Sequence, residues 1–337
     1  MIYPNFLKKK DNIGVTAPSD GNNKELDLIR LNYAIDKLAA LSYPVVETPN
    51  VRISKNGRSG DGKQRAGEFI SLIHHPRVAT IVSAKGGDYL CEMLSYLDFE
   101  EIKKNPKWIQ GYSDNTGILF TVTTLCDIAT LYGNNFNDFG MECWHPSVFN
   151  NFEILQGNLV EQESFDYYED GFYDKETGLE GYRKDKTVCW NHSGEAKEIL
   201  VKGRLLGGCL DVLLNLAGTR FDFTKDYIER YKEDGILWYL ESFETNPETL
   251  TRSLWQLKEA GWFSNASGFI FGRPCMYPEQ SKISYRCVVE ESLKEFKLPM
   301  IFDADIGHKG PQFTMMNGAY ATVWSGYGKG RMRMELR

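Results

Sequence analysis

Three polar residues that lie far apart in the chain are of the types that together carry out nucleophilic hydrolysis: Ser113, Glu241 and His308. A serine hydroxyl becomes an effective nucleophile when a base removes its proton, and a carboxylate keeps an imidazole base in the tautomer that accepts that proton. Each of the three residues follows a stretch that is expected to form a strand. Their shared placement on strand-end loops favours a serine–histidine–glutamate hydrolase as a hypothesis.

The serine lies in residues 107–120, KWIQGYSDNTGILF. An apolar pair precedes a Gly-Tyr-Ser-Asp turn, and apolar residues then recur at helical spacing. The pattern predicts a strand, a sharp turn and a helix, with Ser113 at the corner near the positive end of the helix dipole. The alternative is that Ser113 or Asp114 only caps the helix, because both residue types are favoured there.

His308 and Glu241 each have an ordinary alternative as well. His308 lies in a glycine-rich loop after an expected strand, where it could be a hydrogen-bonded loop histidine. Glu241 directly follows an apolar run, where a carboxylate is costly to bury unless another group pairs with it, but it could instead cap the next helix. The pair Gly86–Gly87 follows another expected strand and could offer backbone N–H groups to an oxyanion.

The elements that would position these residues alternate along the first half of the chain. Apolar runs and helical periodicity predict strands over 12–18, 44–46 and 78–83, with helices over 24–41 and 64–75 between them. Strands and helices in this rhythm indicate a parallel sheet with helices on both faces. Ligands bind such sheets beyond the carboxyl ends of the strands, which is where the Ser113 corner and residues 85–87 fall.

The pattern changes in the second half. One helix is expected over 145–160, and residues 161–189 are irregular, with aromatic residues among Asp and Glu. That segment is either a solvated linker or a binding loop. Regular structure resumes at residue 201, with expected strands over 235–240, 268–272 and 299–302, helices over 247–260 and 282–296, and a hairpin of 319–325 and 331–336.

Composition narrows the class of protein. The chain has 337 residues, 42% hydrophobic and 25% charged, which is ordinary for a globular protein of one or two domains. A net charge of −7 without a basic stripe argues against binding to a nucleic acid polymer. The seven cysteines form no CxxC pair, so no metal and no cofactor is expected. With no signal peptide pattern and no long apolar run, we expect a cytoplasmic protein that makes no membrane contact.

Six stretches, in order, resemble the LD-carboxypeptidases and the related microcin C self-immunity proteins. They are IGVTAPS at 13–19, KGG at 85–87, LSYLDFEEIKKNPKWIQGYSDNTGILF at 94–120, GRLLGGCLDVLLNLAGT at 203–219, LWYLESFETNPETLTRSLWQL at 237–257 and DADIGHKGP at 303–311. Together they run over almost the whole chain.

The resemblance implies a serine peptidase with Ser113 as nucleophile, His308 as general base and Glu241 as its orienter. The N–H groups of Gly87 and Asp114 would form the oxyanion hole. It also implies an α/β fold with an N-terminal flavodoxin-like domain over 1–160, a linker or insert over 161–200 and a smaller C-terminal α/β domain over 201–337. A homodimer is implied too.

The substrate stays open between two branches of the family. One branch removes the terminal D-alanine from murein tetrapeptide, and the other cuts the amide that joins a peptide or aminoacyl group to a nucleotide. The long segment 161–189 and Trp190, which resembles a base-stacking tryptophan, favour the second branch, although Trp190 could equally be a core residue. Gly86 is a further expected substrate-binding residue.

Two departures from the family pattern, at 132–140 and 316–318, leave open a binding protein that has kept the cleft and lost turnover. A third alternative is an α/β-hydrolase esterase, which has the same order of serine, acid and histidine. The sequence disfavours the esterase, because GYSDN lacks the second glycine of the G-x-S-x-G motif.

Overall fold

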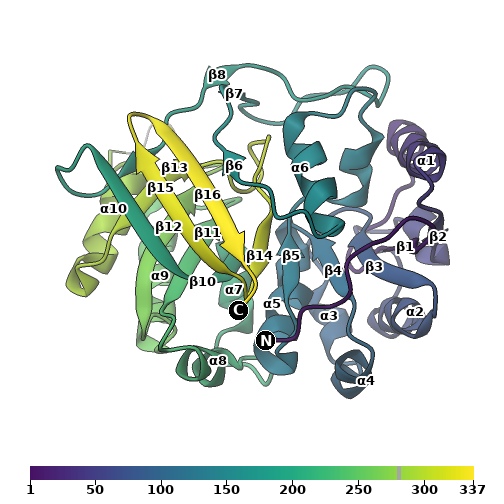
Figure 1. Cartoon of the computed structure of the whole chain (residues 1–337), viewed down its shortest axis with the longest axis horizontal. Helices are drawn as coiled ribbons and strands as arrows, with labels where there is room; N and C mark the ends of the chain where they lie inside the picture. The colour runs from purple at the N-terminus through teal and green to yellow at the C-terminus, as the bar shows by residue number, and fades with distance from the viewer. Residues whose placement is uncertain (279–281) are drawn as a thin grey trace. The chain divides into compact units, whose positions relative to one another are not determined.

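The computed structural model describes residues 1–278 and 282–337, and the chain divides into two compact units, each with its own sheet (Figure 1). The first unit contains Met1–Asn158 and Tyr173–Gly181, and the second contains Leu159–Phe172 and Tyr182–Arg337. Residues 161–200, expected as a linker or insert, are therefore shared between the units, and most of them belong to the second.

The first unit is built on a parallel sheet. Its strands lie in the order β5-β4-β3-β1-β2 and all run parallel. This is the order of flavodoxin-like sheets, so the predicted N-terminal fold is confirmed. The strands are β1 (Asn12–Thr16), β2 (Val45–Glu47), β3 (Val78–Ser83), β4 (Trp108–Gly111) and β5 (Thr130–Tyr132).

Helices lie on both faces of this sheet. The chain leaves β1 in one direction to reach β2 and returns in the other to β3, so right-handed connections place α1 on one face and α2 to α5 on the other. Helix α6 lies on the α1 side, where its Phe152 meets Tyr43 and Phe139 edge-on. In agreement, α2 packs on α4 and α4 packs on α5, whereas α1 packs on the turn Phe136–Gly140. The helices are α1 (Glu25–Ala40), α2 (Gly62–His74), α3 (Cys91–Leu94), α4 (Phe99–Lys104), α5 (Thr116–Cys126) and α6 (Pro146–Leu155).

The second unit is built on a mixed sheet of eight strands in the order β6-β16-β15-β10-β11-β12-β13-β9. Its central strands, β10 to β13, run parallel, and β15, β16, β6 and β9 are antiparallel to their neighbours. The strands are β6 (Gln162–Glu163), β9 (Asn191–His192), β10 (Glu198–Cys209), β11 (Ile236–Glu241), β12 (Ala266–Gly272), β13 (Met300–Ala304), β15 (Tyr320–Gly326) and β16 (Lys329–Glu335).

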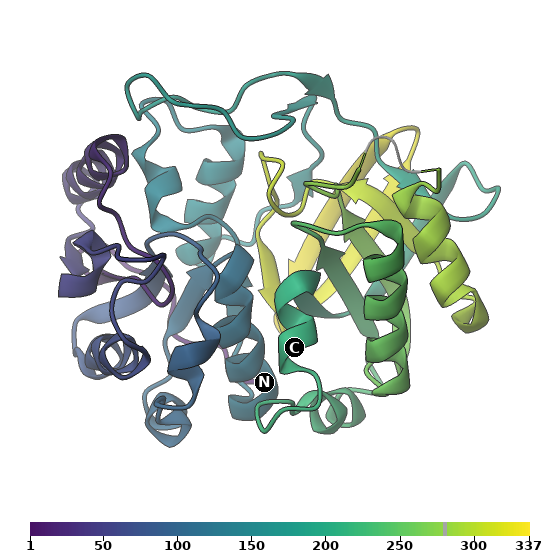
Figure 2. The same ribbon diagram turned by 180° about the vertical axis from the view of Figure 1, so that it is seen from behind.

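The helices of the second unit lie on one face of its sheet, and Figure 2 shows them in green in front of the yellow strands. They are α7 (Leu210–Leu216), α8 (Thr224–Arg230), α9 (Pro247–Glu259) and α10 (Tyr285–Leu293). Between helices and sheet lies a fully buried aromatic core, in which Trp238 stacks on Trp262 and meets Phe263 edge-on.

Most of the predicted elements are confirmed, with two differences. The helix expected over 145–160 ends at Leu155, before Gly157, whose φ of 91° breaks a helix. The sequence pattern also did not show that β10 is a twelve-residue strand. Its glycines lack the side chains that make a strand's alternation visible, and its length comes from pairing with β15 over 198–204 and with β11 over 204–209.

Candidate functional site

The Ser113 corner has the predicted strand–turn–helix form. Strand β4 ends at Gly111, a 3-10 turn covers Ser113–Asn115, and α5 begins at Thr116. Ser113 has a φ of 66°, a left-handed conformation that costs a residue with a side chain about 1–2 kcal/mol. The Thr116 hydroxyl donates to the Ser113 carbonyl at 2.7 Å, which holds the turn. Strain of this kind at a polar residue is typical of functional sites.

Neither Ser113 nor Asp114 caps α5. The cap position is Asn115, and no side chain there accepts a hydrogen bond from the helix start. The predicted capping role of Asp114 is therefore wrong. Its carboxylate turns away from the helix, because Ser19 Oγ donates to it at 2.5 Å and the Leu90 N–H at 2.9 Å. Burial raises the pKa of Asp114, and these two hydrogen bonds lower it in part.

The glycine pair 86–87 approaches this corner closely. A Cβ built on Gly86 would lie 3.0 Å from the Ser113 Cβ and 3.1 Å from its Oγ. Such contacts are tighter than normal packing, so the loop can pass the serine at this distance only because residue 86 has no side chain. The structure thus places Gly86, Gly87, Ser113 and Asp114 in one neighbourhood of the first unit.

Glu241 and His308 form a buried pair in the second unit. The His308 Nδ1 lies 3.0 Å from the Glu241 Oε2. The Glu241 side chain is fully buried and that of His308 is 6% exposed. An ionised carboxylate can only accept hydrogen bonds, so Nδ1 carries the proton and Nε2 is left as the nitrogen that can accept one. This is the orientation that a general base requires.

The alternative role for Glu241, capping the next helix, is excluded. Helix α9 is capped by Asn246, whose side chain accepts from the Thr249 N–H. The turn after β11 is instead held by Asp211, which accepts the N–H groups of Phe243 and Glu244. This turn places the Phe243 ring 4.6 Å from the His308 ring, centroid to centroid.

A buried ion pair also holds the loop that carries His308. Arg273, which follows β12, donates to the Asp305 carboxylate at 2.7 Å, and both side chains are almost completely buried. Its other nitrogen donates to the carbonyl of Lys309 at 3.0 Å. Burial raises the pKa of Asp305, and the Arg273 guanidinium opposes that shift. Neither residue was predicted from the sequence. Arg273 directly follows the apolar strand 266–272, and a charged residue directly after an apolar run is the pattern that singled out Glu241.

The described residues offer no place for a metal ion. Among residues 1–278 and 282–337, no group of three or more His, Cys, Asp or Glu side chains is arranged as a metal site. Over the same residues, no helix has the length and apolarity needed to span a membrane.

The chain matches known proteins over both units. The model of the LD-carboxypeptidase N-terminal domain matches residues 13–133, and that of the LD-carboxypeptidase C-terminal domain matches residues 202–323. The chain belongs to the LD-carboxypeptidase family. By family it is a carboxypeptidase of the serine peptidase type.

Individual relatives come from two branches of this family. The microcin C7 self-immunity protein MccF of Escherichia coli is 27% identical over 289 residues, which cover 79% of this chain and 77% of the relative. The structure of MccF in complex with aspartyl sulfamoyl adenosine is 22% identical, covers 100% of both chains and has a TM-score of 0.82. The muramoyltetrapeptide carboxypeptidase of Oxalobacter formigenes is 19% identical, covers 96% of this chain and 98% of its own, and has a TM-score of 0.73.

The two LD-carboxypeptidase domains contain every residue predicted to do chemistry, and the segment between them, 134–201, contains Trp190. The Trp190 ring is only 2% exposed, and its Nε1 donates to the Asp305 carboxylate at 2.9 Å. It packs against Gly330, where a Cβ would lie 2.0 Å from the ring. The base-stacking role remains a prediction, and this buried position does not support it.

The irregular segment 161–189 is anchored to the His308 loop, as far as its residues belong to the second unit. The Phe165 N–H donates to the Asp305 carboxylate at 3.3 Å, and the Glu169 N–H to the Gly310 carbonyl at 2.8 Å. Asp170 pairs with Lys309 at 2.6 Å. The segment thus helps to hold the loop that carries His308, a role that differs from both predicted ones, a solvated linker and a ligand-binding loop.

Proposed function

We propose that this protein is a serine carboxypeptidase that hydrolyses a C-terminal amide bond with Ser113, His308 and Glu241 as its catalytic triad. The observation that carries the proposal is the buried Glu241–His308 hydrogen bond of 3.0 Å. A fully buried carboxylate is costly unless its partner stabilises it, and here the partner is an imidazole whose Nε2 would act as the base. The strained backbone of Ser113 supports the same reading.

In this mechanism the Nε2 of His308 takes the Ser113 proton as Oγ attacks the carbonyl carbon of the amide. Glu241 stabilises the imidazolium that results. The N–H groups of Gly87 and Asp114 hold the negative charge of the tetrahedral intermediate. His308 then protonates the leaving nitrogen, and the acyl-serine ester is hydrolysed when His308 activates a water molecule.

The substrate is proposed to be a small peptidyl or aminoacyl amide. One candidate is an aminoacyl-nucleotide conjugate of the microcin C type, which the name of MccF and its complex with aspartyl sulfamoyl adenosine support. The other is an LD-linked murein tetrapeptide, which the Oxalobacter formigenes enzyme supports. We propose the conjugate first, because MccF is the closer of these two in identity.

The test compares wild type and Ser113→Ala on both substrates under the same conditions. We expect wild type to cleave at least one of them, and Ser113→Ala to lose roughly four or more orders of magnitude in kcat with its fold intact. Ser71→Ala is the matched control, since Ser71 lies on the surface of α2 and its hydroxyl donates to the Glu68 carbonyl of the same helix.

Three outcomes would contradict the proposal. Hydrolysis that persists in Ser113→Ala would remove the serine from the mechanism. Tight binding of both ligands by wild type without product release over hours would indicate a binding protein. Rapid cleavage of simple nitrophenyl esters, with neither amide cleaved, would indicate an esterase.

We also propose a homodimer, on the family resemblance alone. Light scattering after gel filtration would give twice the chain mass of 38.5 kDa if this is right, and the chain mass itself if it is wrong.

A further inference from the structure

We infer that Ser19 and the carboxylate of Asp114 are positioning residues, which set the spacing between the two proposed oxyanion donors, the N–H groups of Gly87 and Asp114. The inference rests on the proposed function and adds to it two side-chain groups that do not touch the substrate. All of the contacts that support it lie within the first unit.

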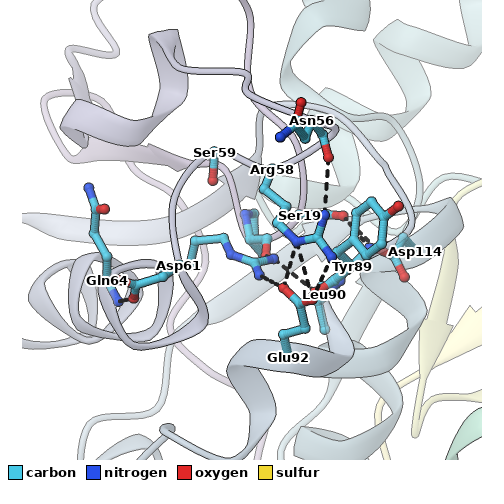
Figure 3. Close-up of polar contacts among 12 residues, drawn as sticks. Ser19, Asn56, Arg58, Ser59, Asp61, Gln64, Tyr89, Leu90, Glu92 and Asp114 are labelled. Carbon is cyan, nitrogen blue, oxygen red and sulfur yellow. Dashed lines mark hydrogen bonds and ion pairs between the residues drawn. The ribbon is translucent and has the colours of Figure 1, made fainter.

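The two side chains form one hydrogen-bonded group (Figure 3). Ser19 Oγ donates to the Asp114 Oδ2 at 2.5 Å, and the Leu90 N–H donates to the same oxygen at 2.9 Å. The Tyr89 N–H donates to Ser19 Oγ at 3.2 Å. The Ser19 hydroxyl and the Asp114 carboxylate therefore accept the N–H groups of two consecutive residues shortly after Gly87. Asp114 also provides the second proposed oxyanion donor with its own backbone N–H.

Ser19 also supports Gly87 directly. A Cβ on Gly87 would lie 2.3 Å from Ser19 Oγ and 3.1 Å from the Asp20 nitrogen. The φ of Gly87 is 156°, and the neighbouring Gly86 carbonyl accepts the Asp20 N–H at 3.4 Å. The loop at 86–87 thus lies against Ser19, so a shift of the Ser19 side chain would be felt at Gly87.

A buried arginine fixes the same two loops from another side. Arg65 is fully buried and donates to the carbonyls of Pro18 and Tyr89, each at 2.9 Å. It also pairs with Glu92 at 2.6 Å, and Glu92 pairs in turn with Arg58 (Figure 3). The residues before Ser19 and before Leu90 are therefore joined, and the hydrogen bonds of Ser19 and Leu90 to the Asp114 carboxylate connect both loops to the serine corner.

The link matters because an oxyanion hole works only when its donors lie 2.7–3.1 Å from the oxyanion. A hydroxyl–carboxylate hydrogen bond is among the stronger and shorter kinds. Removal of the Ser19 hydroxyl would break this hydrogen bond, leave the Tyr89 N–H without its acceptor and loosen the position of Gly87 relative to Asp114. Removal of a whole oxyanion donor lowers kcat about 100- to 1,000-fold, so a displaced donor should lower it about 10- to 100-fold.

The test measures kcat and KM for Ser19→Ala and Asp114→Asn on the substrate that wild type cleaves. Substrate affinity is measured separately by calorimetry in the Ser113→Ala background, where no turnover occurs. We expect Ser19→Ala to lower kcat about 10- to 100-fold with KM and the ground-state Kd almost unchanged, because the donors act on the oxyanion alone. Asp114→Asn keeps an acceptor oxygen and should lower kcat less.

Thr123→Val is the matched control. It also removes a buried hydroxyl hydrogen bond from the first unit, that between Thr123 and Thr130, but away from the two donors. It should lower the thermal midpoint and leave kcat unchanged. The inference is overturned if Ser19→Ala has the kcat of Thr123→Val, or if it raises KM and Kd at constant kcat. If Ser19→Ala does not fold, a wild-type kcat for Asp114→Asn overturns it.

Failure of this inference can be told from failure of the proposed function. If Ser113→Ala still hydrolyses the substrate, the proposed function is wrong and the oxyanion assignment goes with it. If Ser113→Ala is inactive while both positioning variants keep the wild-type kcat, only the positioning role is wrong.

Discussion

The serine corner and the histidine loop hold their key side chains by different physical means. Ser113 is held by backbone: a strained turn between β4 and α5, and a glycine pair that passes it at contact distance. His308 is held by charge: a buried carboxylate at its Nδ1 and a buried Arg273–Asp305 pair beneath its loop. Both arrangements fix a side chain, but a substitution should affect activity and stability differently in the two regions.

This difference separates activity from stability. Breaking a buried ion pair leaves an uncompensated charge, which typically costs about 3–5 kcal/mol of folding stability. Crowding a tight backbone approach displaces a nucleophile and costs turnover first, since a displacement of about 1 Å can lower rates about 100-fold. We therefore expect substitutions in the histidine loop to lower both turnover and folding stability, and substitutions at the serine corner to lower mainly turnover.

The largest effect should come from His308→Ala. Without its base, the enzyme should lose roughly four or more orders of magnitude in kcat, as large a loss as that of Ser113→Ala. The measurement is turnover with and without added imidazole, which should restore part of the activity. His74→Ala is the control, because His74 is half exposed and pairs with Glu101 at the surface. Turnover within tenfold of wild type in His308→Ala would show that the base lies elsewhere.

The next effect tests the charged support of the histidine loop. Asp305→Asn should lower the free energy of unfolding by about 3–5 kcal/mol, because Arg273 stays buried without its counter-charge. Urea unfolding gives the value. In the control, Glu290→Gln breaks the exposed pair with Arg286 and should cost no more than about 1 kcal/mol. Equal losses of unfolding free energy in the two variants would contradict the prediction, because the buried Arg273–Asp305 pair would then contribute no more to stability than an exposed pair.

A smaller effect is expected from Gly86→Ala at the serine corner. The added methyl group would lie 3.0 Å from the Ser113 Cβ, so the serine must shift slightly and kcat should fall on the order of 10-fold. The thermal midpoint should change little. Gly67→Ala is the control: it lies in α2 with open space around its Cβ, so it should keep full activity and gain up to about 1 kcal/mol of stability. A Gly86→Ala enzyme with wild-type kcat would show that the close approach is not needed.

The smallest effect concerns Lys107, which precedes β4 and donates to the carbonyls of His75 and Val78. Burial lowers its pKa to about 8, against about 10.4 in an unfolded chain. Between these values the unfolded chain binds more protons than the native one, so the contribution of Lys107 to stability rises with pH. Urea unfolding at pH 7.5 and 9.5 should show this rise in wild type and a smaller one in Lys107→Met. The exposed Lys9→Met serves as the control, and the same rise in Lys107→Met would be contrary to the prediction.

The sequence alone could predict what depends on local pattern. The strand–turn–helix form around Ser113 and most strands and helices follow from apolar spacing, and they are confirmed. The hydrogen bonds of the Asp114 carboxylate could not be predicted, because its partners, Ser19 and Leu90, lie on loops that only the strand order of the sheet brings close to it. The ion pair of Arg273 and Asp305 could not be predicted for the same reason, because the two residues follow strands that are neighbours only in the folded sheet. Trp190 was singled out for its type, yet its burial is decided by the packing of Gly330 and Asp305 around it.

The most direct test of the central claim labels the nucleophile without assuming a substrate. A fluorophosphonate reacts with a serine that a base has activated, and peptide mass spectrometry then identifies the modified residue. We predict one label per chain, on Ser113, with none on Ser113→Ala and far slower labelling of Ser113 in His308→Ala. A label on another residue, or Ser113 labelled equally fast without His308, would contradict the account.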